Sequence, residues 1–237
     1  NINIDIMSAL PGQTYESYED TLQKVIALEP EHISAYSLIV EEGTPFYERY
    51  GEGVLEEGTD TNEVAQTMDY APMYLPLPDE ETERKMYHKT KTILQKAGYG
   101  RYEISNYAKK GYECLHNLTY WTGVEYLGLG IGAASYLKGY RFKNTSDRQW
   151  YINYLSGNAK KRFLQSAYSE GECFHPLHEE IQKLSIEERM EEYMFLGLRL
   201  KKGVSLSDFK NYFGKTMDEV YGLVIDNLKK ESLLLQK

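Results

Sequence analysis

Cysteine is scarce in this sequence: only Cys114 and Cys173 occur among 237 residues. Two thiols cannot form a disulfide framework or supply four ligands to an iron–sulfur cluster. Long apolar runs are missing too, since no stretch approaches the roughly 18 apolar residues of a membrane-spanning helix. The first residues also lack the basic region of a signal peptide. We therefore expect a cytoplasmic protein, and membrane association is not visible in the sequence.

An excess of positive charge is missing as well. Lysine and arginine number 27 against 36 aspartates and glutamates, which gives a formal net charge of −9. Because nucleic acid is bound by cationic surfaces, this balance argues against nucleic acid as a general partner. Hydrophobic residues make up 41% and charged residues 27%, as is typical of a globular protein with a core. Tyrosine is abundant, with 22 residues, and often lines surfaces where an apolar ring meets water.

The first forty residues predict a strand–helix–strand unit. Isoleucines at positions 2, 4 and 6 alternate with Asn3 and Asp5, a period of two that indicates a strand. Thr14 is a suitable cap for a helix that runs to about Leu28. The range His32–Val40 then reads as a second, largely buried strand. Short links between these elements imply parallel strands with a right-handed crossover.

The rest of the chain divides into an α/β part and a helical part. Residues 1–155 are expected to form the first domain, with a mobile insertion at 56–78. Within it, Asp79 should cap a helix that ends near Gly98, and Tyr99–Tyr107 is a strand candidate. Residues 156–175 are expected to be a connector, and 176–237 a mainly helical, winged-helix-like domain. Its helices should begin near residues 185, 207 and 216.

Two features of the α/β part suggest a ligand site. Asp5 lies on the polar side of its strand, which leads into a turn, and such carboxylates often line a ligand crevice. Alternatively, Asp5 is a solvated residue at the edge of the sheet and contacts no ligand. Gly128, Gly130 and Gly132 lack the spacing and order of a dinucleotide-binding loop. They indicate a close approach of the backbone, either to a flat ligand or to another strand.

The segment His116–Trp121 combines an imidazole, an amide, a phenol and an indole within six positions. The imidazole could ligate a metal or a haem iron, and the aromatic rings could stack on a planar ligand. The alternative is a histidine that hydrogen-bonds the backbone and holds the loop. The sequence shows no pattern of a catalytic triad built on serine or cysteine. It shows no clear metal-binding motif either, and it points to no catalytic residue.

Five strings occur in this order along the chain: Asn3–Ile6 with Leu10–Thr14, His32–Leu38, Gly98–Tyr99 with Tyr102–Ala108, His116–Trp121 and Tyr126–Gly130. Together they resemble the oxygen-independent coproporphyrinogen III oxidase family of radical S-adenosylmethionine (SAM) proteins. The resemblance extends from residue 1 to about residue 237. The tail is similar to the C-terminal helical domain of that family.

Two of these strings distinguish branches of the family. The oxidases proper show M-D-H-F-A where this chain has Ile104–Ala108, and H-R-N-F-Q-G-Y where it has His116–Trp121. The sequence instead resembles the HemW-type branch, which is regarded as haem chaperones. The resemblance implies the C-terminal part of a radical SAM partial (β/α)6 barrel, followed by a small helical domain. It implies a protein that binds SAM and haem or another porphyrin and delivers haem to an accepting protein.

The resemblance also implies site residues and cofactors. Asp5, Ile39 (or its neighbour Val40) and Ala134 match positions that face SAM in the family. The H-N-x-x-Y-W string implies haem contacts by His116, Asn117, Tyr120 and Trp121. The C-x-x-x-C-x-x-C motif of the [4Fe–4S] cluster is absent from the 237 residues, so the ligands of that cofactor are expected outside this chain. The chain alone is therefore expected to be inactive.

Two other functions stay open at this point. One is oxygen-independent coproporphyrinogen III oxidation in porphyrin biosynthesis, the coproporphyrinogen dehydrogenase reaction of a radical SAM oxidoreductase. The other is a winged-helix binding module in the tail, for instance for DNA. Residues 176–237 carry 11 acidic and 10 basic residues, a poor balance for phosphate contacts, so packing is the favoured role of the tail.

Overall fold

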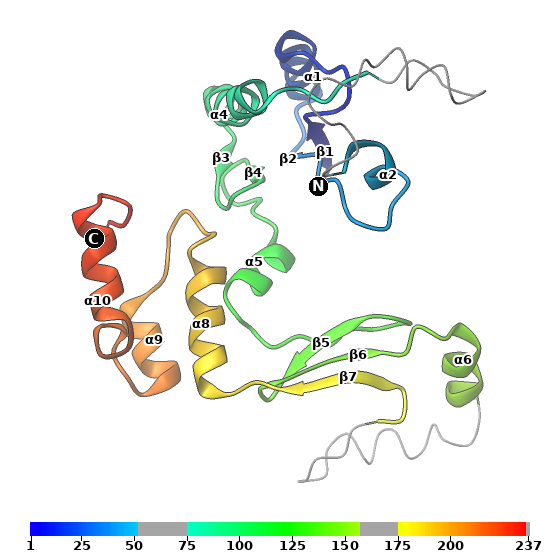
Figure 1. Cartoon of the computed structure of the whole chain (residues 1–237), viewed down its shortest axis with the longest axis vertical. Coiled ribbons are helices and arrows are strands. Elements are labelled where there is room, and N and C mark those ends of the chain that lie inside the picture. The colour runs from blue at the N-terminus through cyan, green and yellow to red at the C-terminus, as the bar shows by residue number, and fades with distance from the viewer. Residues whose placement is uncertain (52–74, 157–174, 236–237) are drawn as a thin grey trace. The chain divides into compact units, whose positions relative to one another are not determined.

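The computed structural model describes residues 1–51, 75–156 and 175–235 (Figure 1). Its chain forms two compact units, Asn1–Cys114 and Leu115–Lys237, each with its own sheet. No described helix is long and apolar enough to cross a membrane. The domain boundaries at 155 and 176 stay predictions. Most of the insertion expected at 56–78, and of the connector expected at 156–175, lies outside the described residues.

The first unit combines a four-stranded sheet with two long helices. The strand order is β1-β2-β4-β3; β1 and β2 are parallel, whereas β4 is antiparallel to both of its neighbours. This arrangement confirms the predicted strand–helix–strand unit. The elements are β1 (Asn3–Ser8), α1 (Tyr15–Ala27), β2 (His32–Ser37), α2 (Tyr47–Tyr50), α4 (Glu80–Lys96), β3 (Gly100–Arg101) and β4 (Asn106–Ala108).

Both long helices of this unit begin at side chains that cap their first turn. The Thr14 hydroxyl accepts a hydrogen bond from the Ser17 amide at 3.2 Å, and the Ser17 hydroxyl oxygen accepts one from the Thr14 amide at 3.1 Å. Asp79 accepts a hydrogen bond from the Thr82 amide at 2.7 Å, and hydrogen bonding by Thr82 lowers the pKa of the Asp79 carboxyl. Since these groups satisfy amides that a helix leaves unpaired, α1 and α4 start where the sequence predicts.

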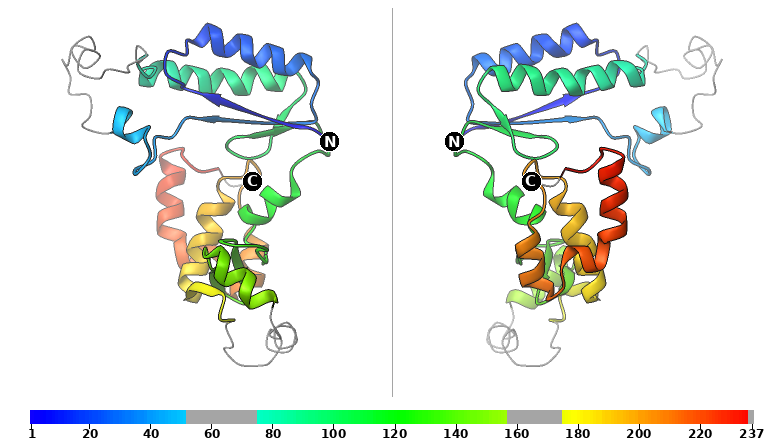
Figure 2. Two further views of the ribbon diagram at one scale, coloured as in Figure 1. Left: turned by 90° about the vertical axis from the view of Figure 1, so that its right-hand side faces the viewer. Right: turned by 90° about the vertical axis from the view of Figure 1, so that its left-hand side faces the viewer.

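Helices α1 and α4 pack beside each other on one face of the sheet (Figure 2). Between helices and sheet lies a core in which the Tyr18 hydroxyl and the Thr90 hydroxyl are 2.9 Å apart. Alternate residues of β1 and β2 therefore have opposite surroundings, apolar toward the helices and polar on the other face. The buried members of this core are Ile6, Tyr18, Leu22, Ile33, Ala35, Met86, Leu94, Tyr99 and Tyr107.

Two strand predictions in this unit are wrong. The second strand ends at Ser37 rather than Val40, because Leu38 makes the last hydrogen bond to β1, from its amide to the Ser8 carbonyl. The range Tyr99–Tyr107 is two short strands, β3 and β4, and not one. The buried Glu103 carboxylate accepts a hydrogen bond from the Ser105 amide at 2.7 Å, which stabilises the turn between them.

Replacing Ala9 with glycine is expected to stabilise the protein by about 0.5–1 kcal/mol. Ala9 follows β1 and has a φ of 60°, a left-handed conformation that costs a residue with a Cβ roughly 1–2 kcal/mol. Part of this gain is offset by the greater backbone freedom of glycine in the unfolded chain. Chemical denaturation measures the change in the free energy of unfolding. Ala35→Gly, in the extended strand β2, is the control and should lower stability.

The second unit joins a three-stranded antiparallel sheet, ordered β5-β6-β7, to a group of helices. Lys138 and Gly139 connect β5 to β6 with φ values of 51° and 77°, as a tight two-residue hairpin requires. The elements are α5 (Leu115–Trp121), β5 (Ala134–Leu137), β6 (Tyr140–Asn144), α6 (Arg148–Ser156), β7 (His178–Lys183), α8 (Ile186–Gly197), α9 (Leu206–Phe213) and α10 (Met217–Lys230).

The last three helices begin at capping residues. Ser185 with Glu188 and Thr216 with Glu219 form capping boxes, so the predicted starts of α8 and α10 are confirmed. Helix α9 is capped by Ser205, two residues before the predicted position. Strand β7 precedes these helices and pairs with β6, and the sequence did not predict this strand. The buried core of these helices consists of Met190, Phe209, Met217 and Ile225.

Candidate functional site

The sheet of the first unit has one polar face, which lies opposite the face covered by α1 and α4. Asp5 is exposed on β1 and is paired with Ser34 on β2. On the other side of β2, Ser34 is also paired with Asn106 on β4. We call this surface the polar sheet face; its residues are Asn3, Asp5, Met7, His32, Ser34, Tyr36 and Asn106.

A chain of hydrogen bonds orders one end of the polar sheet face. The amide oxygen of Asn3 lies 2.6 Å from His32 Nδ1 and accepts a hydrogen bond from the Ser34 hydroxyl at 3.2 Å. The Asn3 amide nitrogen donates to the Asp5 carboxylate at 2.7 Å. His32 Nε2 lies 2.8 Å from the Tyr102 hydroxyl. Each of these contacts holds the Asp5 carboxylate or its neighbours in a fixed orientation.

His32 is suited to the neutral form within this network. Burial lowers the pKa of its imidazole, while the charges of Asp5 and Glu103 act in the opposite direction with a smaller effect. A neutral imidazole carries one N–H and one acceptor nitrogen. Nδ1 can therefore donate to Asn3 while Nε2 accepts from the Tyr102 hydroxyl, which satisfies both ring nitrogens without a buried positive charge.

Two hydrogen-bond acceptors on this face could receive donors from a ligand. The Asp5 carboxylate is exposed, and the Asn106 Oδ1 atom is buried without a hydrogen-bond partner among the described residues. An unpaired buried acceptor carries a desolvation cost that a ligand hydroxyl or amino group would remove. SAM offers both kinds of donor, on its ribose and on its amino group. The residues of the polar sheet face therefore fit part of such a ligand.

Ile39 lies beyond this arrangement. It follows the end of β2, five residues after Ser34, and 77% of its surface is exposed. The three steps along β2 from Ser34 to Ser37 span roughly 10 Å, so Ile39, past the end of that strand, lies at a different level of the unit from Asp5. Val40, its neighbour, is half-buried. The structure thus brings Asp5 together with Ser34 and Asn106 and does not bring it beside Ile39.

Ala134 belongs to the second unit, where it is the first residue of β5. The glycine-rich segment packs against it, and a Cβ built on Gly128 would collide with the Ala134 carbonyl oxygen. The Asn144 amide donates hydrogen bonds to the carbonyl oxygens of Gly128 and Gly130, at 3.2 and 2.8 Å. At Gly128, the close approach expected of these glycines is therefore to a strand.

Helix α5 separates the residues of the H-N-x-x-Y-W string into two groups. His116 and Tyr120 are one turn apart, and their ring centroids lie 4.9 Å from each other at an interplanar angle of 89°. Tyr126 continues this series 4.8 Å from Tyr120, and Tyr136 lies 6.4 Å from Tyr126. We call these four residues the aromatic row. Since His116 is exposed, its imidazole is accessible to a ligand.

Asn117 and Trp121 form the second group, again one turn apart. The Arg199 guanidinium lies over the Trp121 ring, 4.5 Å from its centroid, and the buried Trp121 Nε1–H has no hydrogen-bond partner among the described residues. Positions 116 and 121 point about 140° apart on a helix, because each residue turns by roughly 100°. One flat ligand therefore cannot stack on both groups at once.

The described residues do not fit an iron–sulfur cluster. They contain no group of three or more histidine, cysteine, aspartate or glutamate side chains that could hold a metal ion. Cys114 is a free thiol, and Cys173 lies outside the described residues. An iron–sulfur cluster is held by several thiolates, which the described residues do not supply.

We expect the isolated chain to stay colourless after anaerobic reconstitution with iron and sulfide. The reason is that its two cysteines cannot provide the three or four thiolates that a cluster needs. Absorbance between about 400 and 420 nm, with iron and sulfide analysis after desalting, measures incorporation. Stoichiometric iron and sulfide that chelation removes would contradict this expectation.

Several residues of these surfaces were missed by sequence reasoning. The polar residues His32, Ser34 and Tyr36 alternate with the apolar residues of β2, a signal that would have placed them beside Asp5. Nothing comparable marks Asn106 or Arg199, because each is brought into place by segments that are distant in the sequence.

Comparison with known proteins gives consistent matches. Residues 184–237 match the HemN C-terminal domain. The heme chaperone HemW of Lactococcus lactis is 36% identical over 234 residues, which cover 99% of this chain and 52% of that protein. The heme chaperone HemW of Bacillus subtilis is 34% identical with the same coverage. The chain thus spans about half the length of these curated relatives.

A solved structure matches the whole fold. Coproporphyrinogen III oxidase (HemN) from Escherichia coli, described as a radical SAM enzyme, superposes with a TM-score of 0.65 and 15% sequence identity. The match covers 99% of this chain and 49% of that enzyme. This agreement confirms the predicted fold class, an α/β part of the radical SAM fold followed by a mainly helical domain.

Proposed function

Since this chain is related to the HemW proteins along nearly its whole length and carries the HemN C-terminal domain, we propose that it acts in haem handling as a haem chaperone. Two surfaces support the proposal, one for each small molecule. The polar sheet face is proposed to bind SAM, and the aromatic row to bind haem. The observation that carries the proposal is the exposed His116 imidazole, set edge-on against Tyr120 in the string that distinguishes this branch.

Haem is proposed to bind against the aromatic row with His116 as an axial ligand. A neutral imidazole nitrogen is a common ligand of haem iron. Tyr120 is 38% exposed, so part of its ring is free to contact a porphyrin. Asn117 and Trp121 lie in the second group on α5, so their contact with haem would be made at its edge and not by stacking on the same face.

Titration of the 237-residue chain with haemin tests this proposal. A haem protein with an imidazole ligand should show a shifted Soret band that saturates at one haem per chain. Product analysis of the full-length protein incubated with coproporphyrinogen III provides the second arm, because a chaperone should leave this compound unchanged whereas an oxidase should not. Absence of any saturable Soret change would contradict the haem-handling function.

SAM is proposed to contact Asp5 and Asn106 on the polar sheet face. A carboxylate accepts hydrogen bonds from ribose hydroxyls or from the amino group of the ligand, and the Asn106 oxygen provides a second acceptor. The two further positions, Ile39 and Ala134, would supply apolar and small contacts. They lie in different units of the chain and are proposed as contacts on the resemblance alone.

Asp5→Asn is expected to weaken SAM binding by about 1–3 kcal/mol, the loss of one charge-assisted hydrogen bond. The substitution keeps the shape of the side chain and removes its charge. Asp20→Asn is the matched control: Asp20 is an exposed carboxylate on α1, paired with Lys24, away from the polar sheet face. Isothermal titration calorimetry of the full-length protein with SAM measures both. Equal affinities for Asp5→Asn and the unaltered full-length protein would remove Asp5 from the site.

The partners follow from this function. A chaperone passes its cargo on, so a haem-accepting protein is the proposed macromolecular partner. The cytoplasm is the proposed location. The packing of α8, α9 and α10 around Phe209 favours a structural role for the last helices, and their charge gives no support for binding nucleic acid.

A further inference from the structure

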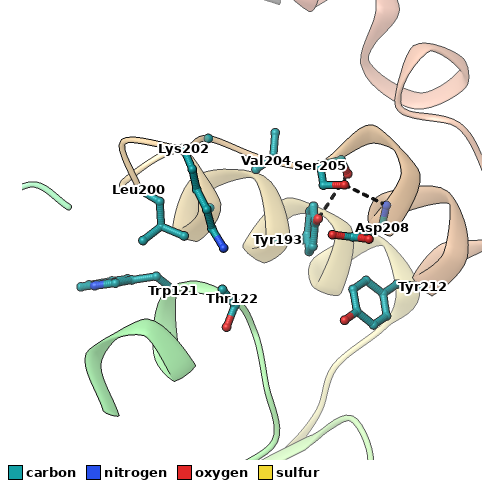
Figure 3. Close-up of a pocket in the computed structure, with 11 residues that line it drawn as sticks. Trp121, Thr122, Tyr193, Leu200, Lys202, Val204, Ser205, Asp208 and Tyr212 are labelled. Carbon is teal, nitrogen blue, oxygen red and sulfur yellow. Dashed lines mark hydrogen bonds between the residues drawn. The ribbon is translucent and has the colours of Figure 1, made fainter. Parts of the chain in front are cut away.

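A cavity of about 470 Å³ lies inside the second unit, next to the end of α5 (Figure 3). Its volume is within the range of small-molecule sites. The walls are aromatic and apolar with a few polar groups, and they come from α5, α8, α9 and the segment between α8 and α9. The lining residues include Trp121, Tyr193, Leu200, Lys202, Asp208 and Tyr212.

The α5 side of this cavity is positively charged. Arg199 and Lys202 take part in no ion pair within the described residues, and Arg199 covers one face of the Trp121 ring. Figure 3 shows the Lys202 ammonium group on the Trp121 side of Tyr193, and the Asp208 carboxylate on the Tyr212 side. An anionic group would therefore be attracted to the Trp121 end of the cavity.

Trp121 itself is suited to donate a hydrogen bond and not to stack. The Arg199 guanidinium occupies one ring face at 4.5 Å, while the buried Nε1–H has no acceptor among the described residues. A buried donor without a partner is unfavourable, and an anionic oxygen would satisfy it. The Lys202 ammonium group, which lies between the Trp121 ring and Tyr193, is the donor available to a carboxylate inside the cavity.

We propose that this cavity binds a propionate carboxylate of the haem held at the aromatic row, through Lys202 beside the Trp121 ring. The inference rests on the proposed function and names the part of haem that these residues recognise. Trp121 lies five residues after His116, about 7.5 Å along the axis of α5. The side chains point about 140° apart, so the flat ring stays with His116 and Tyr120. A propionate on a flexible arm reaches the other group.

The test compares haemin with haemin dimethyl ester, in which both propionates are neutral. The unaltered chain should bind haemin about tenfold more tightly than the ester, as expected for one charge-assisted contact at a partly exposed site. In Lys202→Met this preference should disappear, while the position of the Soret band stays the same because His116 is untouched. Lys202 is exposed, so the variant should fold, which circular dichroism verifies.

Lys201→Met is the matched control, because Lys201 is the adjacent lysine and does not line the cavity. It should keep the tenfold preference for haemin. Equal binding of haemin and ester by the unaltered chain would overturn the inference and leave the haem function standing. A preference for haemin that survives in Lys202→Met would also overturn the inference. The same conclusion would follow if Lys201→Met abolished the preference as completely as Lys202→Met does. A chain that shows no saturable Soret change with either compound would refute the haem function, and this inference with it.

Discussion

Phe209→Ala should lower the free energy of unfolding by about 3–5 kcal/mol, the usual cost of removing a fully buried phenylalanine ring. Phe209 has no exposed surface and packs among rings contributed by α8, α9 and α10. Its ring centroid lies 4.8 Å from that of Phe213, 5.6 Å from Tyr193 and 6.1 Å from Tyr221. Because these neighbours cannot collapse into the space without breaking their own contacts, a cavity is expected to remain.

Phe195→Ala is the matched control on α8. Phe195 is 57% exposed, so its loss should cost less than about 1 kcal/mol. Urea denaturation followed by circular dichroism measures both variants. Similar losses in the two would mean that Phe209 does not hold the last three helices together.

The elements that sequence predicts well are those with local signals. The first strand follows from the alternation of isoleucines with Asn3 and Asp5, and each long helix follows from a capping residue with a regular apolar stripe. Ser185 with Glu188 and Thr216 with Glu219 are of the same kind, since both partners lie within one turn. In each case the residues that form the structure are neighbours in the sequence.

The short strands were not predicted from the sequence, because they form only by hydrogen bonding to a partner strand that is distant in the sequence. β3 has two residues and β4 has three, too few for a periodic pattern, and they form where β4 pairs with β2. The buried Glu103 in the turn between them contradicts the general preference of carboxylates for water, and its hydrogen bond from the Ser105 amide compensates part of the cost of burial. β7 was missed for the same reason. Its residues are mostly exposed and so give no apolar alternation, and the strand forms by pairing with β6.

The candidate sites show the same difference between residues marked by local sequence signals and residues brought together from distant segments. Asp5 could be selected from its position on an alternating strand, and His116 from its aromatic neighbours in the sequence. The cavity could not be found in this way, because Trp121 and Lys202 are 81 positions apart in the sequence. The separation of His116 from Trp121 on α5 also became visible only once the helix was defined. It places the Trp121 ring apart from the rings of His116 and Tyr120.

His116→Ala is expected to shift the Soret band of the haem complex and to weaken haem binding by roughly tenfold or more, since it removes an axial ligand of the iron. The free energy of unfolding should change by less than about 0.5 kcal/mol, because the side chain is exposed on a short helix. The competing interpretation makes His116 a structural residue that ties the segment down. In that case the loss would be about 1–3 kcal/mol of stability, from partners left unpaired, with no change in the haem spectrum of the folded protein.

His88→Ala provides the matched control for this experiment. His88 is also exposed on a helix beside a tyrosine, with ring centroids 5.5 Å apart for Tyr87 and His88 and an interplanar angle of 73°. It lies on α4 in the first unit, outside the aromatic row. If imidazole beside tyrosine were sufficient for a non-specific haem contact, both variants would lose affinity alike. A Soret shift confined to His116→Ala identifies the ligand, whereas a stable, folded His116→Ala protein with an unchanged haem spectrum excludes it.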